Sequence, residues 1–313
     1  MQKEIRIKAT ISEIEKAIIQ VIAFFDLFDH PLTAREVWSH LNIKGLTLRE
    51  VWDFLDNSLD VLDSDRGFYF LKGREEIVDI RKERFAFSYK KIKKARKVAR
   101  IFSFLPWIKM IAISNVIGNY NMKKESDIDL FIITGDKRVW ISRFFCILIA
   151  MIFRWRPRPG QEEDKICLSF FISESAYDLE MFRFAPRDIY FTFWIVGLLP
   201  VYNIDYSYEK FIEANKWLRE RLPNWRLKIE AHNHIKKPSR ISSYFLRFFF
   251  GKFENLVRKF QVRIMPPQLK ELINKDTRVV LREDIIKLHT KDRRLLYQED
   301  FEHNYQKTLD LLK

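Results

Sequence analysis

The sequence predicts an α/β (α+β) protein, in which a mixed sheet with flanking helices follows a small domain of three helices and a hairpin. Three apolar runs, at 111–117, 127–133 and 165–173, have the length of buried strands. Helical stripes of apolar residues precede, separate and follow these runs. The predicted units are residues 1–84, 85–205 and a C-terminal helical region over 206–313.

Composition limits the class of protein before any motif is considered. The chain has 313 residues, of which 47% are hydrophobic and 31% charged, so it is too apolar for a disordered chain and too charged for a bundle of membrane helices. The apolar runs at 144–153 and 189–202 are short for a membrane span, and residues 1–16 hold no apolar signal core. We therefore expect a cytoplasmic protein without a transmembrane span.

The first unit is predicted from an apolar helical stripe over 11–28 and a near repeat that follows it. The two copies, Leu32–Leu41 and Leu46–Leu55, each open with a capping box, formed by Thr33 with Glu36 and by Thr47 with Glu50. Two short strands around Gly67 come next. Three helices followed by a hairpin resemble the winged helix-turn-helix family.

The second helix of the repeat is poorly suited to DNA. It offers Arg49 against Glu50, Asp53 and Asp56, whereas a helix that follows a phosphate backbone needs lysine or arginine. We favour a protein-binding or structural role for this domain over DNA recognition, so a protein partner is expected there.

A basic helix is predicted over 85–104. Residues 85–110 hold eight basic residues and no acid, whereas residues 1–84 carry a net charge of −3. A charge run is usually a solvated face. This one leads directly into the chemical motif of the chain, so Lys90–Arg100 is a candidate surface for RNA or another polyanion.

The chemical motif is a pair of aspartates at the start of a strand. Side chains alternate along a strand, so Asp127 and Asp129 share one face while Ile128 points to the other. Two carboxylates before a solid apolar run are costly unless a cation lies between them. Mg²⁺ or Mn²⁺ would supply that charge and would also bind substrate phosphates.

The segment Ser126–Ile133 resembles the second strand of the nucleotidyltransferase superfamily, which includes DNA polymerase beta and the kanamycin nucleotidyltransferases. The resemblance extends from Ile111 to roughly Tyr202. It implies that a nucleoside monophosphate is moved from a nucleoside triphosphate (NTP) to a hydroxyl of a protein, an RNA or a small molecule. Asp127 and Asp129 would be the catalytic metal ligands. It further implies a Gly-Ser pair on the preceding turn, which holds the triphosphate, and a third acid on a later strand.

The chain departs from that pattern at the Gly-Ser pair. The family spacing falls on Asn115-Val116, and the nearest glycine, Gly118 with Asn119, leaves only seven residues before Asp127. Lys123 and Lys124 could contact phosphates or could simply keep the connection soluble. The residues assigned to nucleotide binding are Ser114, Asn115, Gly118, Asn119, Lys123, Lys124 and Ser126.

The second departure is the third acid, which would fall on Cys167 or Ser169. Asp164 and Glu174 flank that strand and could reach the site only in a shifted register. A third acid normally takes the proton from the attacking hydroxyl, so its absence leaves two alternatives: a slow enzyme, or an inactive binding module that engages nucleic acid or a protein. The ordinary alternative for the aspartates is a pair of strand-end carboxylates capped by Ser126 and Asn121.

The remaining segments are predicted to be mainly helical. A helix over 136–156 carries an apolar stripe that includes Leu148 and Met151, and is followed by Arg154, Arg156 and Arg158, which suit phosphates or solubility. Further helices are expected over 188–197, 206–221 and 239–265. The last is basic and amphipathic and could lie on a membrane, but an aromatic stripe at helical spacing is more often core, which is the interpretation we favour.

Overall fold

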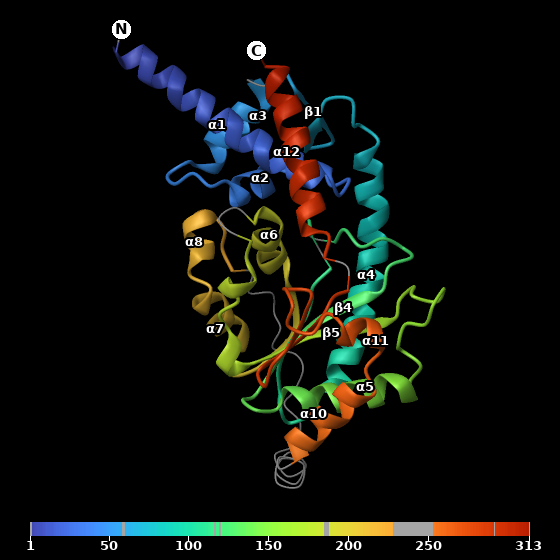
Figure 1. Cartoon of the computed structure of the whole chain (residues 1–313). Helices are drawn as coiled ribbons and strands as arrows, with labels where there is room; N and C mark the ends of the chain where they lie inside the picture. Colours follow the sequence, from blue (N-terminus) through green and yellow to red (C-terminus); the bar gives the residue numbers. More distant parts are fainter. Residues whose placement is uncertain are drawn as a thin grey trace.

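The computed structural model describes residues 2–57, 60–115, 117–118, 120–184, 188–227, 253–290 and 292–312, with side chains from residue 13 onward. It is a mixed α/β structure with one large mixed sheet between two layers of helices (Figure 1). Within these residues no helix is both long enough and apolar enough to cross a bilayer.

The first unit has the predicted order of three helices and a hairpin. The helices are α1 (Gln2–Asp26), α2 (Ala34–His40) and α3 (Leu48–Asn57), and the hairpin strands are β1 (Leu62–Asp65) and β2 (Phe68–Leu71). Both capping boxes form: Thr33 accepts from the Glu36 amide at 3.3 Å, and Thr47 accepts from the Glu50 amide at 3.3 Å. Sequence patterning therefore located both short helices.

The large sheet has the order β6-β3-β4-β5-β8-β7. The pair β4–β5 is parallel and the other four pairs are antiparallel. The strands are β3 (Ile108–Ile113), β4 (Ile128–Thr134), β5 (Ile166–Ser173), β6 (Leu199–Asn203), β7 (Val279–Leu281) and β8 (Ile285–Leu288).

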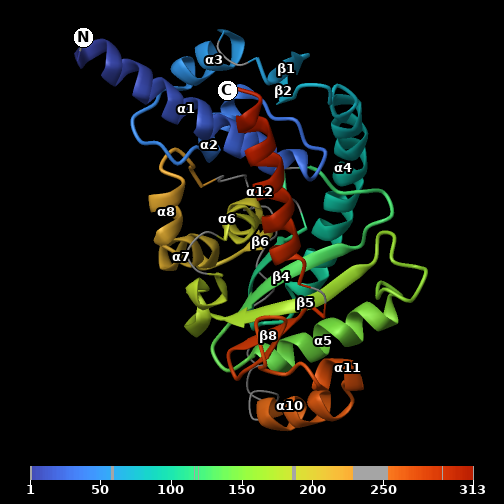
Figure 2. The ribbon, with the colours of Figure 1, turned by 45° about the horizontal axis from the view of Figure 1, so that its top comes forward.

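Two apolar cores lie on the two faces of this sheet (Figure 2). On one face, α4 (Ile77–Phe102) and α5 (Val139–Ile152) pack against alternate residues such as Ile128 and Ile132. On the other, α1, α6 (Ile189–Gly197), α7 (Ser207–Ala214), α8 (Trp217–Arg221) and α12 (Arg294–Asp310) enclose Phe131 and Phe170. The short helix α10 (Glu254–Arg263) packs against α5, and α11 (Pro267–Lys270) lies beside them (Figures 1 and 2).

The helix boundaries differ from prediction in several places, two of which change the expected organisation. The basic helix, expected from residue 85, begins at Ile77, so the expected domain boundary falls inside α4. The helix expected over 206–221 is two helices, since the buried Asn215 side chain bonds the Leu179 amide and the Tyr177 and Phe211 carbonyls and ends α7.

The C-terminal region is not purely helical, which corrects the prediction. β7 and β8 add two strands to the sheet, and β8 pairs with β5 through Phe170 and Lys287. Of the helix expected over 239–265, only α10 lies within the described residues; positions 239–252 lie outside them.

The alternation expected along β5 is interrupted by a bulge. Asp129 pairs with Cys167, but Phe131 pairs with Phe170, so β5 has one extra residue between these pairs. Phe170 therefore packs on the Phe131 face, whereas Phe171 packs on the opposite one. Strict alternation along the strand would have put each phenylalanine on the other face.

Candidate carboxylate site

The two aspartates and Cys167 form a compact cluster at the start of β4 and β5. Asp127 directly precedes β4, and Asp129 is the second residue of that strand. Cys167 of β5 pairs with Asp129 in the parallel register. The ligand atoms of Asp127, Asp129 and Cys167 all lie within 4.8 Å of one another, and each side chain is partly exposed. The third position of the cluster is thus a thiol and not a carboxylate.

Burial and mutual repulsion make the ionised aspartates unfavourable without a cation. Burial, and then the charge of Asp129, raise the pKa of Asp127 to about 7. Burial also raises the pKa of Asp129. The pKa of the Cys167 thiol is raised by burial and by the Asp129 carboxylate, so the thiol stays protonated.

These shifts predict how stability depends on pH in the absence of divalent metal. A carboxyl group with a raised pKa binds more protons in the folded state, so stability is greatest below its ordinary pKa of 3.8 and is lost as the pH rises through about 7. Asp127→Asn should flatten this decline. Thermal midpoints measured in EDTA across that range would test it, and equal slopes for the variant and the wild type would contradict it.

The turn before the aspartates supplies Ser114 and Asn115. The Ser114 amide and hydroxyl donate to the Asp129 carbonyl at 3.0 and 3.3 Å, and Asn115 Nδ2 donates to the Asp127 carbonyl at 2.9 Å. The Asn115 Oδ1 atom is buried and has no partner among the described residues. These two residues therefore lie against the backbone of the aspartate pair.

Gly118 has a packing role that the sequence analysis did not anticipate. Its φ is +76°, and a Cβ there would lie 2.5 Å from the His30 ring. Glycine is therefore required where this turn meets the first unit. Asn119 lies outside the described residues.

The connection that leads into β4 is fixed by α4 and by the first unit. Ser126 Oγ donates to the Lys123 carbonyl at 2.9 Å, and Asn121 Nδ2 donates to the Phe28 carbonyl at 3.0 Å. Neither side chain bonds the aspartates, so the alternative in which they cap these carboxylates was wrong. Lys123 and Lys124 are exposed.

The flanking acids engage lysines away from the cluster. Asp164 accepts from Lys91 at 2.7 Å, and Glu174 lies 3.9 Å from Lys109. Neither belongs to the aspartate cluster among the described residues. A shifted register of β5 that would bring either acid into the site does not occur.

Ser169, two residues beyond Cys167, joins the cluster to a second group of residues. Its hydroxyl lies 2.9 Å from His289 Nε2. Burial, and then the nearby Lys287, lower the pKa of His289 to about 4, so this imidazole is neutral at physiological pH.

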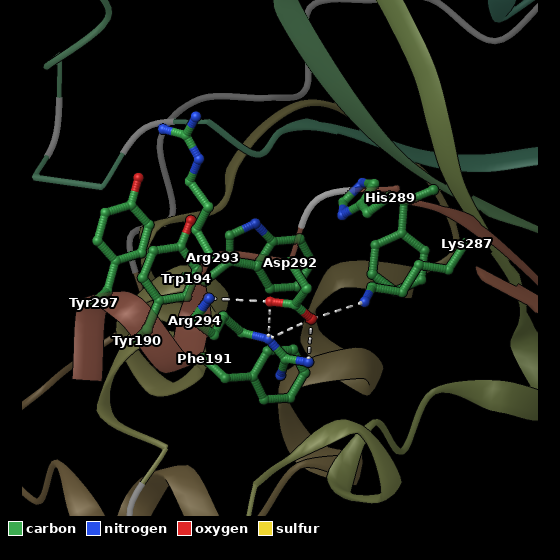
Figure 3. A pocket seen from close by; sticks show the side chains of 10 residues that line it. Tyr190, Phe191, Trp194, Lys287, His289, Asp292, Arg293, Arg294 and Tyr297 are labelled. Atoms are coloured by element: carbon green, nitrogen blue, oxygen red, sulfur yellow. Dashed lines mark hydrogen bonds and ion pairs between the residues drawn. The ribbon is translucent and has the colours of Figure 1, made fainter. Parts of the chain in front are cut away.

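A cavity of about 190 Å³ lies beside His289 and is lined mainly by aromatic side chains. The Tyr190 and Tyr297 rings stack with centroids 5.2 Å apart, and Phe170 stacks on Trp194 at 5.6 Å. Figure 3 shows the two tyrosines beside Trp194, with Arg293 reaching past them. Burial, and then the charges of Tyr297 and Asp129, raise the pKa of Tyr190. The strand β5 connects this cavity with the aspartate cluster, because it contributes Phe170 to the cavity and Cys167 to the cluster.

The charged residues of the cavity differ in their availability. Arg294 is buried and held by Asp292 at 2.7 Å and Asp188 at 2.9 Å. Lys287 bonds the Thr277 carbonyl. The exposed Arg293 has no ion-pair partner in the part of the chain that the structure describes, so it is free to meet an anion.

Sequence reasoning missed this cavity. Tyr190, His289 and Tyr297 are more than 60 residues beyond Asp127, and no short motif contains them. An available signal was the charged run Asp292–Arg294 shortly after an apolar pair of strands.

Comparison of the chain with protein-family models, curated proteins and solved structures finds no match.

Proposed function

We propose that this protein is a metal-dependent nucleotidyltransferase that moves a nucleoside monophosphate from an NTP to a hydroxyl acceptor. The observation that carries the proposal is the paired carboxylates of Asp127 and Asp129, on one sheet face, with ligand atoms within 4.8 Å. Support for the fold it requires comes from the antiparallel β3–β4 pair followed by the parallel β4–β5 pair.

The residues present fit Mg²⁺ or Mn²⁺. Asp127 and Asp129 offer hard oxygen ligands, and the unpaired Asn115 Oδ1 is a further buried acceptor beside them. The protonated Cys167 thiol is a poor ligand for a hard cation. When bound, such a cation neutralises phosphate charge and polarises the reacting phosphoryl group.

The chain's own residues would position the reactants. Ser114 and Asn115 brace the aspartate backbone. Phosphate oxygens would be bound by three exposed cations, Lys123, Lys124 and, at the cavity, Arg293. The rings of Tyr190 and Tyr297 present a stacking surface for a planar base or acceptor. The neutral Cys167 offers no carboxylate base, so transfer is expected to be slow.

The proposal is tested by calorimetry of Mg²⁺-dependent NTP binding, followed by transfer of radiolabel from NTPs to the protein itself, to RNA or to small hydroxylated acceptors. Asp127→Ala with Asp129→Ala should abolish metal-dependent binding. Asp53→Ala, at an exposed acid on α3, is the matched control and should bind as wild type. Equal binding by the double variant would refute the proposal.

A second candidate function is an inactive binding module, favoured by the thiol that stands in the third position of the cluster. In that case the protein would act by binding a polyanion through the basic face of α4. Lys90, Lys93, Lys97 and Arg100 are exposed there, whereas Lys91 is buried and Lys94 is half-buried.

Polyanion binding should depend on this face of α4. Replacing Lys90, Lys93 and Lys97 with glutamate should reduce the slope of log K against log salt by about 2 to 3 for duplex ligands, since each phosphate contact contributes about 0.9. The control is Arg35→Gln with Arg49→Gln on α2 and α3. If the control pair removed the binding and the α4 variant did not, the first unit would be the site.

A further inference from the structure

Polar side chains of helix α10 bind it to α5. Glu254 accepts from the amides of Trp140 and Ile141 at 2.7 and 3.1 Å, which caps the start of α5. Gln261 lies about two turns further along the same side of α10. Its side chain donates to the Trp140 carbonyl at 2.8 Å and accepts from Arg143 at 2.7 Å. The inner face of α10 is therefore partly polar.

The larger apolar side chains of α10 lie on its outer face, whereas Val257 and Val262 pack inward against the core. Leu256 and Ile264 are each 63% exposed and Phe260 is 48% exposed. The aromatic stripe of this helix was predicted to be core, and for these described residues that prediction was wrong. A surface helix normally covers its large apolar side chains, so this outer face is suited to contact with an apolar environment outside the fold.

The C-terminal end of α5 also exposes large apolar side chains. Met151 and Ile152 of α5 are 61% and 68% exposed, and Leu148 is exposed as well, although the stripe with Leu148 and Met151 was expected to cover the sheet. Phe144 of α5 contacts Phe260 of α10, with ring centroids 6.3 Å apart. We call Leu148, Met151, Ile152, Leu256, Phe260 and Ile264 the α5/α10 surface.

Basic residues outnumber acidic ones around this surface. Residues 139–163 and 254–271 contain eight basic and four acidic residues, and one of the acids, Glu254, is used to cap α5. Arg154, Arg156, Lys259 and Arg263 are exposed, and none makes an ion pair with any residue that the structure describes. Figures 1 and 2 both place α5 and α10 at the end of the molecule away from α1 and α3, so a flat partner could approach them.

We propose that the α5/α10 surface docks this protein onto the surface of an anionic lipid bilayer. Large apolar side chains would enter the boundary between headgroups and acyl chains, and the surrounding arginines and lysines would meet anionic headgroups. Charge complementarity selects this occupant, because a neutral protein face would use the apolar residues and leave the basic residues without a role. The proposal is independent of the proposed nucleotidyl transfer.

The test is co-sedimentation of the full chain with phosphatidylcholine vesicles, with and without about 30% phosphatidylglycerol. The wild type should bind the anionic vesicles and bind phosphatidylcholine alone at least tenfold more weakly. Leu256→Gln, Phe260→Gln and Ile264→Gln together should lower the partition coefficient at least tenfold, and Lys259→Gln with Arg263→Gln about tenfold.

Matched controls lie elsewhere on the protein. Leu296→Gln with Leu311→Gln removes apolar side chains that are 57% and 73% exposed, and Lys210→Gln with Lys216→Gln removes exposed charges on and beside α7; both should bind as wild type. All substitutions are at exposed positions, so thermal midpoints should agree and verify folding. Failure of the wild type to bind, or equal binding by the apolar variant, would overturn the proposal. A wild-type dimer in light scattering that the apolar variant abolishes would overturn it too, since a second copy would then cover the surface.

Discussion

Cys167→Asp should tighten Mg²⁺ or Mn²⁺ binding at least tenfold and raise nucleotidyl transfer by about 10²- to 10⁴-fold, the usual contribution of a general base. The thiol sulfur lies within 4.8 Å of the ligand oxygens of both aspartates, and Cys167 faces Asp129 across the parallel pair. A carboxylate there would add a hard ligand where a protonated thiol now stands. Calorimetry of metal binding and initial rates of label transfer would measure the two effects.

The control for this substitution is Cys167→Asn, which has the same shape as aspartate and no charge. It should resemble the wild type in both assays. Ser169→Asp should give a smaller gain, because the side chain at 169 is directed to the neutral His289 at 2.9 Å. The hypothesis would be refuted if the Asp and Asn variants behaved alike. Strong wild-type transfer that required Asp164 or Glu174 would equally show that the base comes from elsewhere.

Much of the carboxylate site could be predicted because its determinants are local. Alternation along one strand places Asp127 and Asp129 on one face, and the apolar run at 165–173 identified β5. The resemblance put the third position at Cys167 or Ser169, and the pairing of Cys167 with Asp129 identifies Cys167 as the residue beside the aspartates. The bulge after Cys167 could not be predicted, since a single extra residue leaves no mark on an apolar run.

The rest of the site depends on pairings that are distant in sequence. His289 reaches Ser169 only because β8 pairs with β5, across more than 110 residues of chain. A strand as short as Ile285–Leu288 has too few residues for its periodicity to be distinguished from a helical turn. The orientation of α10 was predicted wrongly for a similar reason: a helical stripe shows that one face is apolar, but it does not show which face the rest of the fold covers.

Lys91→Met should destabilise the protein by about 2 to 4 kcal/mol, the range expected when a buried charged donor is removed. Lys91 is 2% exposed although it belongs to the basic run of α4. Its ammonium group donates to the Lys124 and Ser126 carbonyls at 2.9 and 2.7 Å and to Asp164 at 2.7 Å. These three acceptors satisfy its three protons. Since Asp164 is 44% exposed and can be rehydrated, most of the loss comes from the two carbonyls.

The same substitution should weaken metal binding at the aspartates. Lys91 holds the residues that immediately precede β4 and β5, and its charge lowers the pKa of Asp127 against the effect of burial. Without the Lys91 charge, the pKa of Asp127 would rise further. The residues that lead into β4 would also lose the hydrogen bonds that fix their position. Lys93→Met, at an exposed lysine of the same helix, should change stability by less than about 0.5 kcal/mol and leave metal affinity unchanged. Denaturant midpoints and metal titrations of the two variants would separate the roles, and equal stability of Lys91→Met and Lys93→Met would show that the buried ammonium does not hold the site together.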